Sequence, residues 1–379
     1  MSLMTYTVLD SYQRFNQKNN MIYRPVWNSS LRHLITDRWE TQLYQIKKKV
    51  SGHELKDYVL GASAGLLVST FGTGINQPNG GLKSWQRLPI NALFKFPGEK
   101  PVTNDRPGMT RQIKKVARFL GADLVGIAPL DLRWVYSYHY IEKTGESKPV
   151  EIDEQLPYVI SMAVEEDYKM IHMAPNALLL AEAARQYSRM AFLVGAVAQF
   201  IRLIGYHAIP SINDSALNIP IAIDAGLGQL GRHGMLITPQ FGPRQRLCKV
   251  FTNLPLEPDR PIDFGVKEFC SVCRKCAQKC PAQAISEGEP TPEAKGISNN
   301  PGVMKYPLDA EKCQGYWSKV GTDCGICIRV CPFNKGKGMH HDTIRWFVKN
   351  APWFDKMFLW LDDHLEYGKC LRPECFWDT

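Results

Sequence analysis

Eight of the eleven cysteines fall in two matching groups between residues 270 and 331. The first group reads Cys270-Ser-Val-Cys273-Arg-Lys-Cys276-Ala-Gln-Lys-Cys280-Pro281. The second group has the same design with a longer first gap, because Cys313 is followed after ten residues by Cys324-Gly-Ile-Cys327-Ile-Arg-Val-Cys331-Pro332. Thiolate sulfur is a strong ligand for iron and zinc, so these two groups indicate metal chemistry.

The spacing of the first group, C-x2-C-x2-C-x3-C-P, is that of bacterial ferredoxins with two [4Fe–4S] clusters. In that design, three cysteines of a tight loop bind one cluster and the fourth binds the other cluster. Cluster one is therefore expected to take Cys270, Cys273, Cys276 and Cys331, and cluster two to take Cys313, Cys324, Cys327 and Cys280. Structural zinc is the alternative, since C-x2-C pairs also make tetrahedral sulfur sites, but the exchange of fourth ligands argues against it.

Length and composition bound what surrounds these cysteines. The chain has 379 residues, of which 44% are hydrophobic, and this is enough for a large core. A disulfide framework is disfavoured, because such frameworks belong to short secreted chains. The longest apolar run, residues 58–71, is too short to predict a membrane span.

The formal net charge of +9 admits nucleic acid, an anionic membrane surface or an acidic electron donor as partners. The charge is spread thinly, however, and its longest run is Lys47–Lys49, which is typical of an ordinary solvated surface. No secretory signal or twin-arginine motif follows Met1. We therefore expect a cytoplasmic protein as written, or one at the outer face of the cytoplasmic membrane if this is a processed form.

The segment before the cysteines has the pattern of helices and strands that is typical of an α/β domain. A helix is predicted from Thr110 to Leu120, and residues 124–127 and 158–164 are predicted to be buried strands. The longest periodic element has Asn176 as its N-cap and ends at Gly205. Tyr187 lies midway along this apolar helix, so its hydroxyl needs a partner, which on this evidence alone would be a backbone carbonyl.

Gly226, Gly228 and Gly231 form a G-x-G-x-x-G pattern. A nicotinamide-binding turn should be followed about twenty residues later by an acidic residue, but none occurs here before Glu257. We reject the dinucleotide interpretation. These glycines are instead expected to let the backbone approach a large flat ligand or a neighbouring strand.

Four regions are expected along the chain. Residues 1–104 are predicted to be an irregular, aromatic-rich segment that wraps the body, and a surface loop is predicted at 287–306 between the cysteine groups. The tail carries Trp346, Phe347, Trp353, Phe354, Phe358 and Trp360, which predict a cap on the core, with a membrane-surface helix as the alternative. The predicted boundaries are 1–104, 105–265, 266–340 and 341–379.

From about residue 105 to 335 the chain resembles the corrinoid-dependent reductive dehalogenases. The resemblance rests on the helix with Tyr187, the turn Ile212-Asn213-Asp214, Ala225-Gly-Leu-Gly-x-x-Gly, Leu-Ile-Thr-Pro and Phe-Gly-Pro-Arg, followed directly by the two cysteine groups. It implies an α/β (α+β) fold, in which a nitroreductase-like corrinoid-binding body is fused to a bacterial two-cluster ferredoxin-like module.

The resemblance also implies a site. Tyr187 would be the proton donor beside Asn213 and Arg246, while Gly226, Gly228, Gly231 and Trp317 would bind the cofactor or line the pocket. The implied cofactors are two [4Fe–4S] clusters and a corrinoid (cobalamin), and the implied partners are a small organohalide and an external low-potential electron donor. No nucleic acid is expected, whereas peripheral membrane association and a homodimer stay open.

An axial histidine for cobalt would need the motif Asp-x-His-x-x-Gly. The nearest match is Asp362-Asp-His364-Leu-Glu-Tyr-Gly368, whose glycine comes one place late. We therefore predict a base-off corrinoid without a protein histidine on cobalt. The aromatic candidates for the substrate pocket are Trp27, Trp85, Tyr136, Tyr138 and Trp317.

Two alternatives remain at this point. Epoxyqueuosine reductases are similar in body, corrinoid and paired clusters but act on tRNA and use a catalytic aspartate, for which Asp214 and Asp224 are the candidates here. A plain electron-transfer iron–sulfur protein would need only residues 265–335, and it would leave the rest of the chain unexplained.

Overall fold

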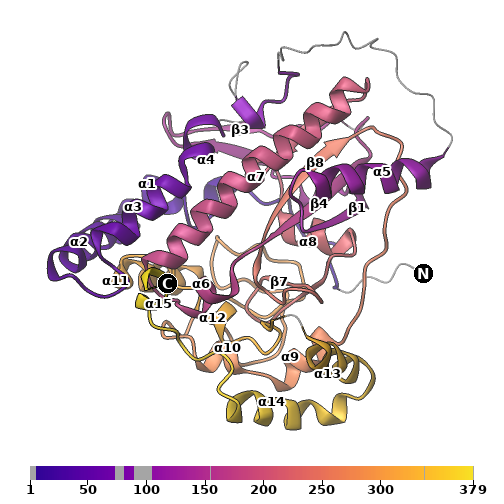
Figure 1. The fold of residues 1–379 in the computed structure, drawn as a ribbon. Coiled ribbons are helices and arrows are strands. Elements are labelled where there is room, and N and C mark those ends of the chain that lie inside the picture. The colour runs from indigo at the N-terminus through magenta and orange to yellow at the C-terminus, as the bar shows by residue number, and fades with distance from the viewer. Residues whose placement is uncertain (1–5, 73–80, 89–104, 154, 337, 379) are drawn as a thin grey trace.

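The computed structural model describes residues 6–72, 81–88, 105–153, 155–336 and 338–378. The long helix α7 (Ala177–Leu203) runs along a central sheet, and the cysteine module lies beyond one end of that sheet (Figure 1). The C-terminal helices α13 (Met339–Asn350) and α14 (Asp355–His364) form the outer edge of the molecule. Within the described ranges, no helix is both long and apolar enough to cross a bilayer.

The central sheet is antiparallel, with the strand order β1-β4-β8-β5. Its strands are β1 (Leu124–Pro129), β4 (Tyr158–Glu165), β8 (Gln245–Thr252) and β5 (Ala208–Ser211). The two central strands β4 and β8 are mostly buried along their length, and β4 has a nearly continuous apolar sequence, whereas β8 carries the polar residues Gln245, Arg246 and Lys249. The register sets Arg246 opposite Val164 and Gln245 opposite Glu165, so the end of β4 meets the start of β8.

Helix α7 has the bounds that the sequence predicts. The Asn176 side chain accepts hydrogen bonds from the backbone N–H groups of Leu178 and Leu179, and Gly205 follows the last turn. One face of α7 packs on the sheet in the main hydrophobic core, and Tyr187 lies at the edge of that core. Helix α5 (Arg106–Phe119) begins before the predicted Thr110, because Asp105 caps it by accepting from the backbone of Gly108.

The prediction of an irregular N-terminal segment is wrong for residues 24–71. This stretch forms helices α1 (Arg24–Trp27), α2 (His33–Lys48), α3 (Leu55–Ala64) and α4 (Leu66–Phe71). Helix α2 packs on α11 (Ala310–Val320), and α3 packs on α7. The approach to α7 is close because Gly61 and Gly65 face Ala181 and Ala184. Packing between small residues, which has little periodic signal, therefore holds α3 against α7.

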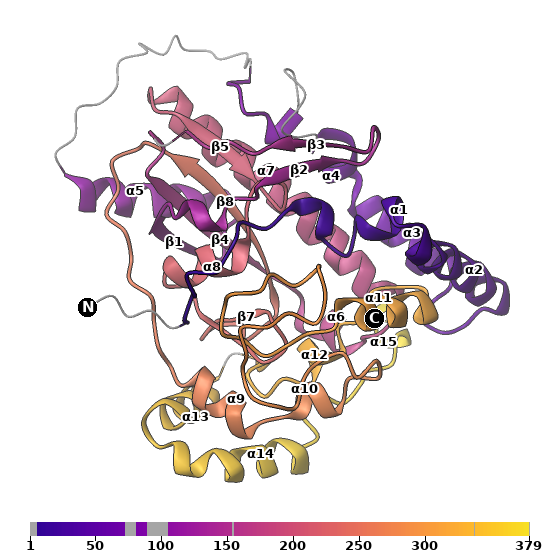
Figure 2. The same ribbon diagram turned by 180° about the vertical axis from the view of Figure 1, so that it is seen from behind.

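Shorter elements complete the body and the cysteine module. The body adds α6 (Tyr168–His172), α8 (Asn218–Asp224) and the hairpins β2 (Tyr138–Ile141) to β3 (Glu146–Pro149) and β6 (Gln229–Leu230) to β7 (Leu236–Ile237). The module has α9 (Val266–Val272), α10 (Lys275–Gln278), α11 and α12 (Ile326–Arg329), and α15 (Glu374–Trp377) ends the chain. Seen from behind, α9 lies between β7 and the C-terminal helices (Figure 2).

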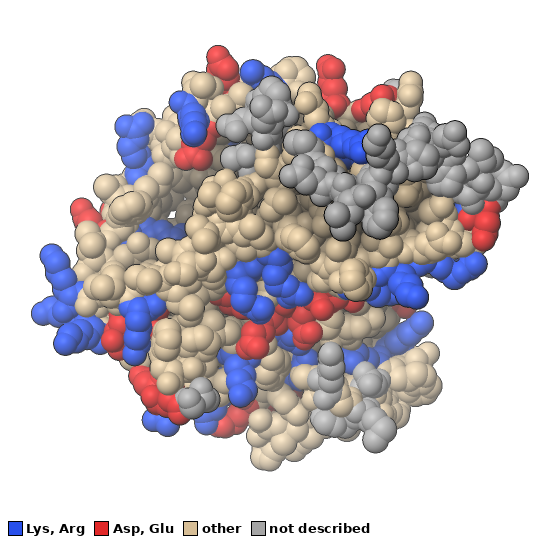
Figure 3. Space-filling view, turned by 45° about the horizontal axis from the view of Figure 1, so that its top comes forward, with Lys and Arg blue, Asp and Glu red and all other residues tan. Residues whose placement is uncertain are grey.

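Basic and acidic side chains are interspersed on the face seen in Figure 3. On that face the net positive charge therefore forms no single basic patch. This distribution is typical of a solvated surface, as the sequence predicts.

Candidate active site

A cavity of about 420 Å³ lies between the sheet, the N-terminal segment and the insert that separates the cysteine groups. Most of its lining is apolar or aromatic, and none of the described residues in the lining is Asp, Glu or His. The wall is built from distant parts of the sequence, including Tyr6, Tyr12, Trp134, Tyr136, Tyr187, Asn213, Met235, Arg246, Asn300, Val303 and Lys305. Such a concave, largely apolar space with a few polar groups is typical of a small-molecule site.

Tyr187, Asn213 and Arg246 meet in this cavity although they come from α7, the turn after β5, and β8. The side-chain Nδ2 of Asn213 donates to the Tyr187 hydroxyl oxygen at 2.8 Å. The Arg246 guanidinium carbon lies 5.6 Å from the centre of the Tyr187 ring. The partner of Tyr187 is thus a side chain that itself faces the cavity, and not a backbone carbonyl.

The direction of the Tyr187 hydrogen bond follows from a buried lysine. Lys249 is fully buried, and its Nζ, which only donates, lies 2.8 Å from Oδ1 of Asn218. The Nδ2 of Asn218 therefore donates to Oδ1 of Asn213 at 2.7 Å, and this leaves Nδ2 of Asn213 to donate to Tyr187. Because the Tyr187 oxygen accepts from Asn213, its own proton is available to a molecule in the cavity.

Arg246 is held by a carboxylate that the sequence analysis missed. Its Nε donates to Oε1 of Glu166 at 2.7 Å, and the Glu166 side chain is only 1% exposed. Burial lowers the pKa of Arg246, but the negative charge of Glu166 more than offsets this effect, so the pKa lies above its ordinary value. Arg246 is therefore a fixed cation beside the Tyr187 ring.

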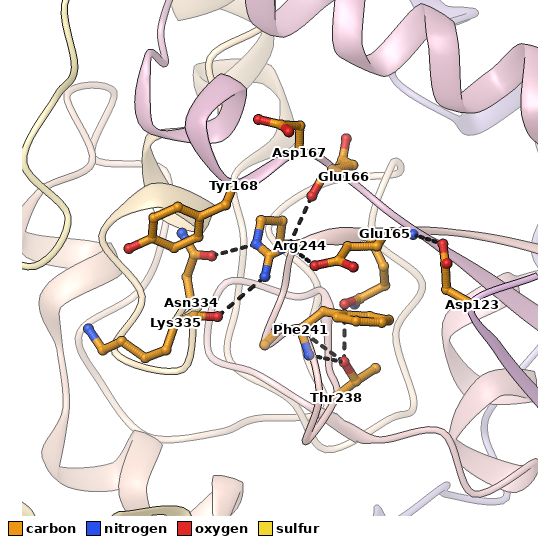
Figure 4. A network of polar contacts seen from close by, with 12 residues as sticks. Asp123, Glu165, Glu166, Asp167, Tyr168, Thr238, Phe241, Arg244, Asn334 and Lys335 are labelled. Carbon is orange, nitrogen blue, oxygen red and sulfur yellow. Dashed lines mark hydrogen bonds and ion pairs between the residues drawn. The ribbon is translucent and has the colours of Figure 1, made fainter. Parts of the chain in front are cut away.

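Arg244, two residues earlier, has a different environment (Figure 4). It is 2% exposed and donates to Oε1 of Glu165 at 2.5 Å, to the carbonyl of Glu166 at 2.9 Å and to Oδ1 of Asn334 at 3.0 Å. A further bond of 3.3 Å reaches the carbonyl of Lys335. Arg244 thereby connects the end of β4 to the segment that follows Cys331.

The cysteines gather in the two sets that their spacing predicts. A small cavity is lined by Cys270, Cys273, Cys276 and Cys331. In the second set, burial and the nearby thiols of Cys324 and Cys280 together raise the pKa of Cys313 to about 12. Burial also raises the pKa of Cys327 well above its ordinary value, and Cys324 and Cys313 again add to the shift. Buried thiols that lie this close to one another lose their protons readily only when a metal centre supplies positive charge.

The first cysteine set is arranged around a small space. Cys270, Cys273, Cys276 and Cys331 line it, as the four sulfur ligands of a [4Fe–4S] cluster surround the cluster.

Both cysteine sets lie near the wall of the main cavity. Met235, which lines the cavity, packs against the same small apolar cluster as Cys327 of the second set. The first set packs with Phe269 and Phe333, and also with Ile237, whose chain neighbour Leu236 lines the cavity.

None of the three glycines predicted to lie against a flat ligand or a neighbouring strand lines the cavity. A side chain at Gly226 would lie 2.4 Å from the carbonyl oxygen of Arg260, and one at Gly228 would lie 2.1 Å from that of Ile237. Gly231 faces the side chains of Ile237 and His233. The close approach of the chain itself therefore requires Gly226 and Gly228, and the neighbour of Gly228 and Gly231 is the strand β7.

Trp317 also lies away from the cavity lining. It is half-buried on α11, with the guanidinium carbon of Arg38 5.7 Å from its ring centre. Of the aromatic residues proposed for a substrate pocket, Tyr136 lines the cavity, whereas Trp27, Trp85 and Tyr138 do not.

Comparisons with known proteins agree with this arrangement. Residues 269–334 match the family model described as a 4Fe-4S double cluster binding domain. The chain is 36% identical over 393 residues to the tetrachloroethene reductive dehalogenase of Sulfurospirillum multivorans, covering 94% of this chain and 78% of that protein. It is 38% identical over 332 residues to the enzyme of the same name from Dehalobacter restrictus, covering 78% of this chain and 60% of that protein.

Among solved structures, a reductive dehalogenase described as B12-dependent superposes with a TM-score of 0.71 at 25% identity. The superposition covers 97% of this chain and 48% of that one, so this chain spans about half of that structure.

Proposed function

Because this chain belongs to the corrinoid-dependent reductive dehalogenase family, we propose that it replaces a halogen of a small chlorinated alkene with hydrogen. The overall reaction takes two electrons and one proton, breaks the carbon–halogen bond, forms a carbon–hydrogen bond and releases halide. Two similar proteins named for tetrachloroethene support this substrate class. The observation that carries the proposal is the hydrogen-bond chain from Lys249 to Tyr187, which leaves the tyrosine proton facing the cavity.

In this proposal Tyr187 gives its proton to the carbon that loses halide. Asn213 holds the tyrosine oxygen, and through it the direction of the O–H bond. Arg246 places a fixed positive charge beside the ring, which favours the tyrosinate that remains and attracts the departing halide. The apolar lining keeps water away from the reacting carbon.

Electrons enter through the cysteine module in this proposal. Cluster one, on Cys270, Cys273, Cys276 and Cys331, would receive them from an external donor, and cluster two, on Cys313, Cys324, Cys327 and Cys280, would pass them to the cavity. The order is supported by the position of Cys327 near the cavity-lining Met235. Iron–sulfur clusters reach potentials of roughly −700 mV, so electrons of sufficient energy can be delivered.

The residues that line the cavity are suited to contact the periphery of a corrinoid ring. Asn20, Asn300 and Lys305 line the cavity and offer amide and amine groups for the polar substituents of the ring, while Leu236 and Val303 offer apolar contact. When bound, the corrinoid supplies the cobalt chemistry that cleaves the carbon–halogen bond. The lining formed by the described residues contains no imidazole, so base-off binding without a protein histidine remains our prediction.

The environments of Asp214 and Asp224 favour dehalogenation over the epoxyqueuosine alternative. Asp214 is buried and accepts from the Ser211 hydroxyl and from the backbone of Ile212. Asp224 accepts from the Tyr6 hydroxyl and the Trp134 indole. Both bonds to Asp214 go to its Oδ1, and its Oδ2 lies 3.6 Å from Nζ of Lys83. Neither carboxylate lines the cavity, where a catalytic aspartate would be needed.

The test uses the full chain, purified without oxygen and reconstituted with corrinoid. We expect about eight iron atoms and one cobalt per chain, as two four-iron clusters and one corrinoid require. Chloride release from tetrachloroethene with an artificial low-potential donor measures the activity. Zinc in place of iron and cobalt, or a loaded protein that releases no chloride from any chlorinated ethene, would overturn the proposal. Nitrogen hyperfine splitting in the resonance spectrum of the cobalt(II) form would overturn base-off binding.

A further inference from the structure

A buried group of three charges lies beside the first cysteine set. The carboxylate of Asp362, on α14, accepts from Nζ of Lys275 and from Nζ of Lys335. The Asp362 side chain is 5% exposed, and those of the two lysines are 11% and 12% exposed. Lys275 stands between Cys273 and Cys276, and Lys335 follows Cys331 by four residues. Three separate segments of the chain thus place charged side chains together beside the first cysteine set.

These charges act strongly because water is largely excluded from them. In a buried setting the effective dielectric constant is far below that of water, so each charge is felt at a longer range. The two ion pairs adjoin the loops that carry the ligands, because Lys275 lies in the chain between Cys273 and Cys276. A cluster that gains an electron gains negative charge, so a nearby ammonium favours its reduction and a nearby carboxylate opposes it.

Two of the three residues lie outside the match to the double-cluster family model, which ends at residue 334. Asp362 belongs to the C-terminal cap, so the cap contributes a charge to the cluster site as well as apolar cover. Neighbouring Asp363 also pairs with Lys275, at 2.7 Å, but its side chain is 64% exposed. Solvent weakens an exposed pair of this kind.

We propose that Lys275, Asp362 and Lys335 set the reduction potential of cluster one, with Asp362 keeping it low by cancelling ammonium charge. The cluster ligands are Cys270, Cys273, Cys276 and Cys331, so this inference rests on the cluster assignment in the proposed function. The step concerned is the uptake of one electron by the oxidised cluster from the external donor. A lower potential makes the cluster a stronger reductant for the next carrier in the chain.

The test is a redox titration of the reconstituted full chain, followed by electron paramagnetic resonance of the reduced clusters. Asp362→Asn should raise the midpoint potential of cluster one, because two ammonium charges then stabilise the added electron. Lys335→Met should lower it, because a compensating cation is lost. We expect each change to alter the ratio of reduced to oxidised cluster at a fixed potential roughly tenfold, which is about 59 mV for one electron.

Opposite shifts of the midpoint potential in Asp362→Asn and Lys335→Met would distinguish an effect of charge from an effect of structural damage. A loosened site would shift the potential of both variants in the same direction. Asp363→Asn is the matched control and should leave the potential nearly unchanged, since its charge is exposed. Asp362→Glu should restore the wild-type value. If Asp362→Asn loses iron, Lys335→Met and Lys335→Arg still decide the question. Equal potentials in wild type and both charge variants would refute the tuning role, whereas a wild-type chain without cluster signals would refute the cluster assignment itself.

Discussion

Arg244 and Arg246 stand two residues apart, yet they serve different parts of the molecule. Arg244 is 2% exposed and its guanidinium bonds to Glu165, Glu166, Asn334 and Lys335. The Arg246 side chain is 28% exposed, and the described residues give its guanidinium one hydrogen-bond partner, Glu166. The four hydrogen bonds of Arg244 fix the body to the cysteine module, whereas Arg246 lines the cavity, where a substrate or product can contact its guanidinium.

The cavity side of this comparison is tested most strongly by Tyr187→Phe. The change keeps the ring and its packing but removes the proton that faces the cavity. General-acid roles are typically worth about a hundred- to ten-thousand-fold in rate, so we expect a loss of that size in dehalogenation. The assay uses an artificial low-potential donor after iron and cobalt have been measured. Turnover near that of wild type with both cofactors present would leave Tyr187 with a structural role only.

The connecting side is tested by Arg244→Leu. Removing one partner of a buried ion pair leaves the other charge uncompensated, and this typically costs about 3 to 5 kcal/mol of stability. We expect a lower unfolding temperature and easier loss of iron, because Asn334 and Lys335 lose their link to β4. Thermal unfolding and iron content are the measurements. Unchanged values for both would mean that Arg244 does not hold the module to the body.

Arg246→Leu should lower turnover more than it weakens the attachment of the cysteine module. We expect a loss of about tenfold in rate, which corresponds to about 1.4 kcal/mol, because the acid keeps its proton but loses the neighbouring charge. The substitution also leaves Glu166 buried without its cation, so Arg246→Leu with Glu166→Gln is the matched control. The double variant should recover stability and keep the rate defect. If the double variant recovers its rate together with its stability, Arg246 has a structural role like that of Arg244.

The smallest expected effect concerns pH and Lys249. Burial lowers the pKa of Lys249 to about 8, while the nearby Asp214 raises it in part. Between this pKa and that of an unfolded lysine, about 10.4, the unfolded chain binds the extra proton, so stability rises with pH from about 8 upward. The gain from pH 8 to 9 should be on the order of 1 kcal/mol. Lys249→Met should show a flatter dependence in unfolding experiments, and an identical slope would contradict the assignment.

The sequence predicts best where local chemistry decides. The cysteine sets follow from spacing, and α7 follows from Asn176 and Gly205, because both depend on residues near one another in the chain. The roles of Glu166 and Lys249 could not be predicted, because they depend on the register of β4 and β8 and on the return of residues 212–218 to β8. The backbone that approaches Gly226 belongs to Arg260, far along the chain, so local sequence could not distinguish a ligand from a neighbouring segment there.

The second cysteine set would anchor the loop that forms one wall of the cavity. Asn300, Val303 and Lys305 belong to the insert that lies between Cys280 and Cys313. With both cysteines on one cluster, iron–sulfur bonds join the two ends of this loop and remove the conformational freedom that an open loop of its length would have. An isolated β-bridge between Val303 and Val8 also pairs the insert with the N-terminal segment. Oxidative loss of that cluster would therefore release the wall from one side, so that damage by oxygen changes the shape of the cavity as well as interrupting its electron supply.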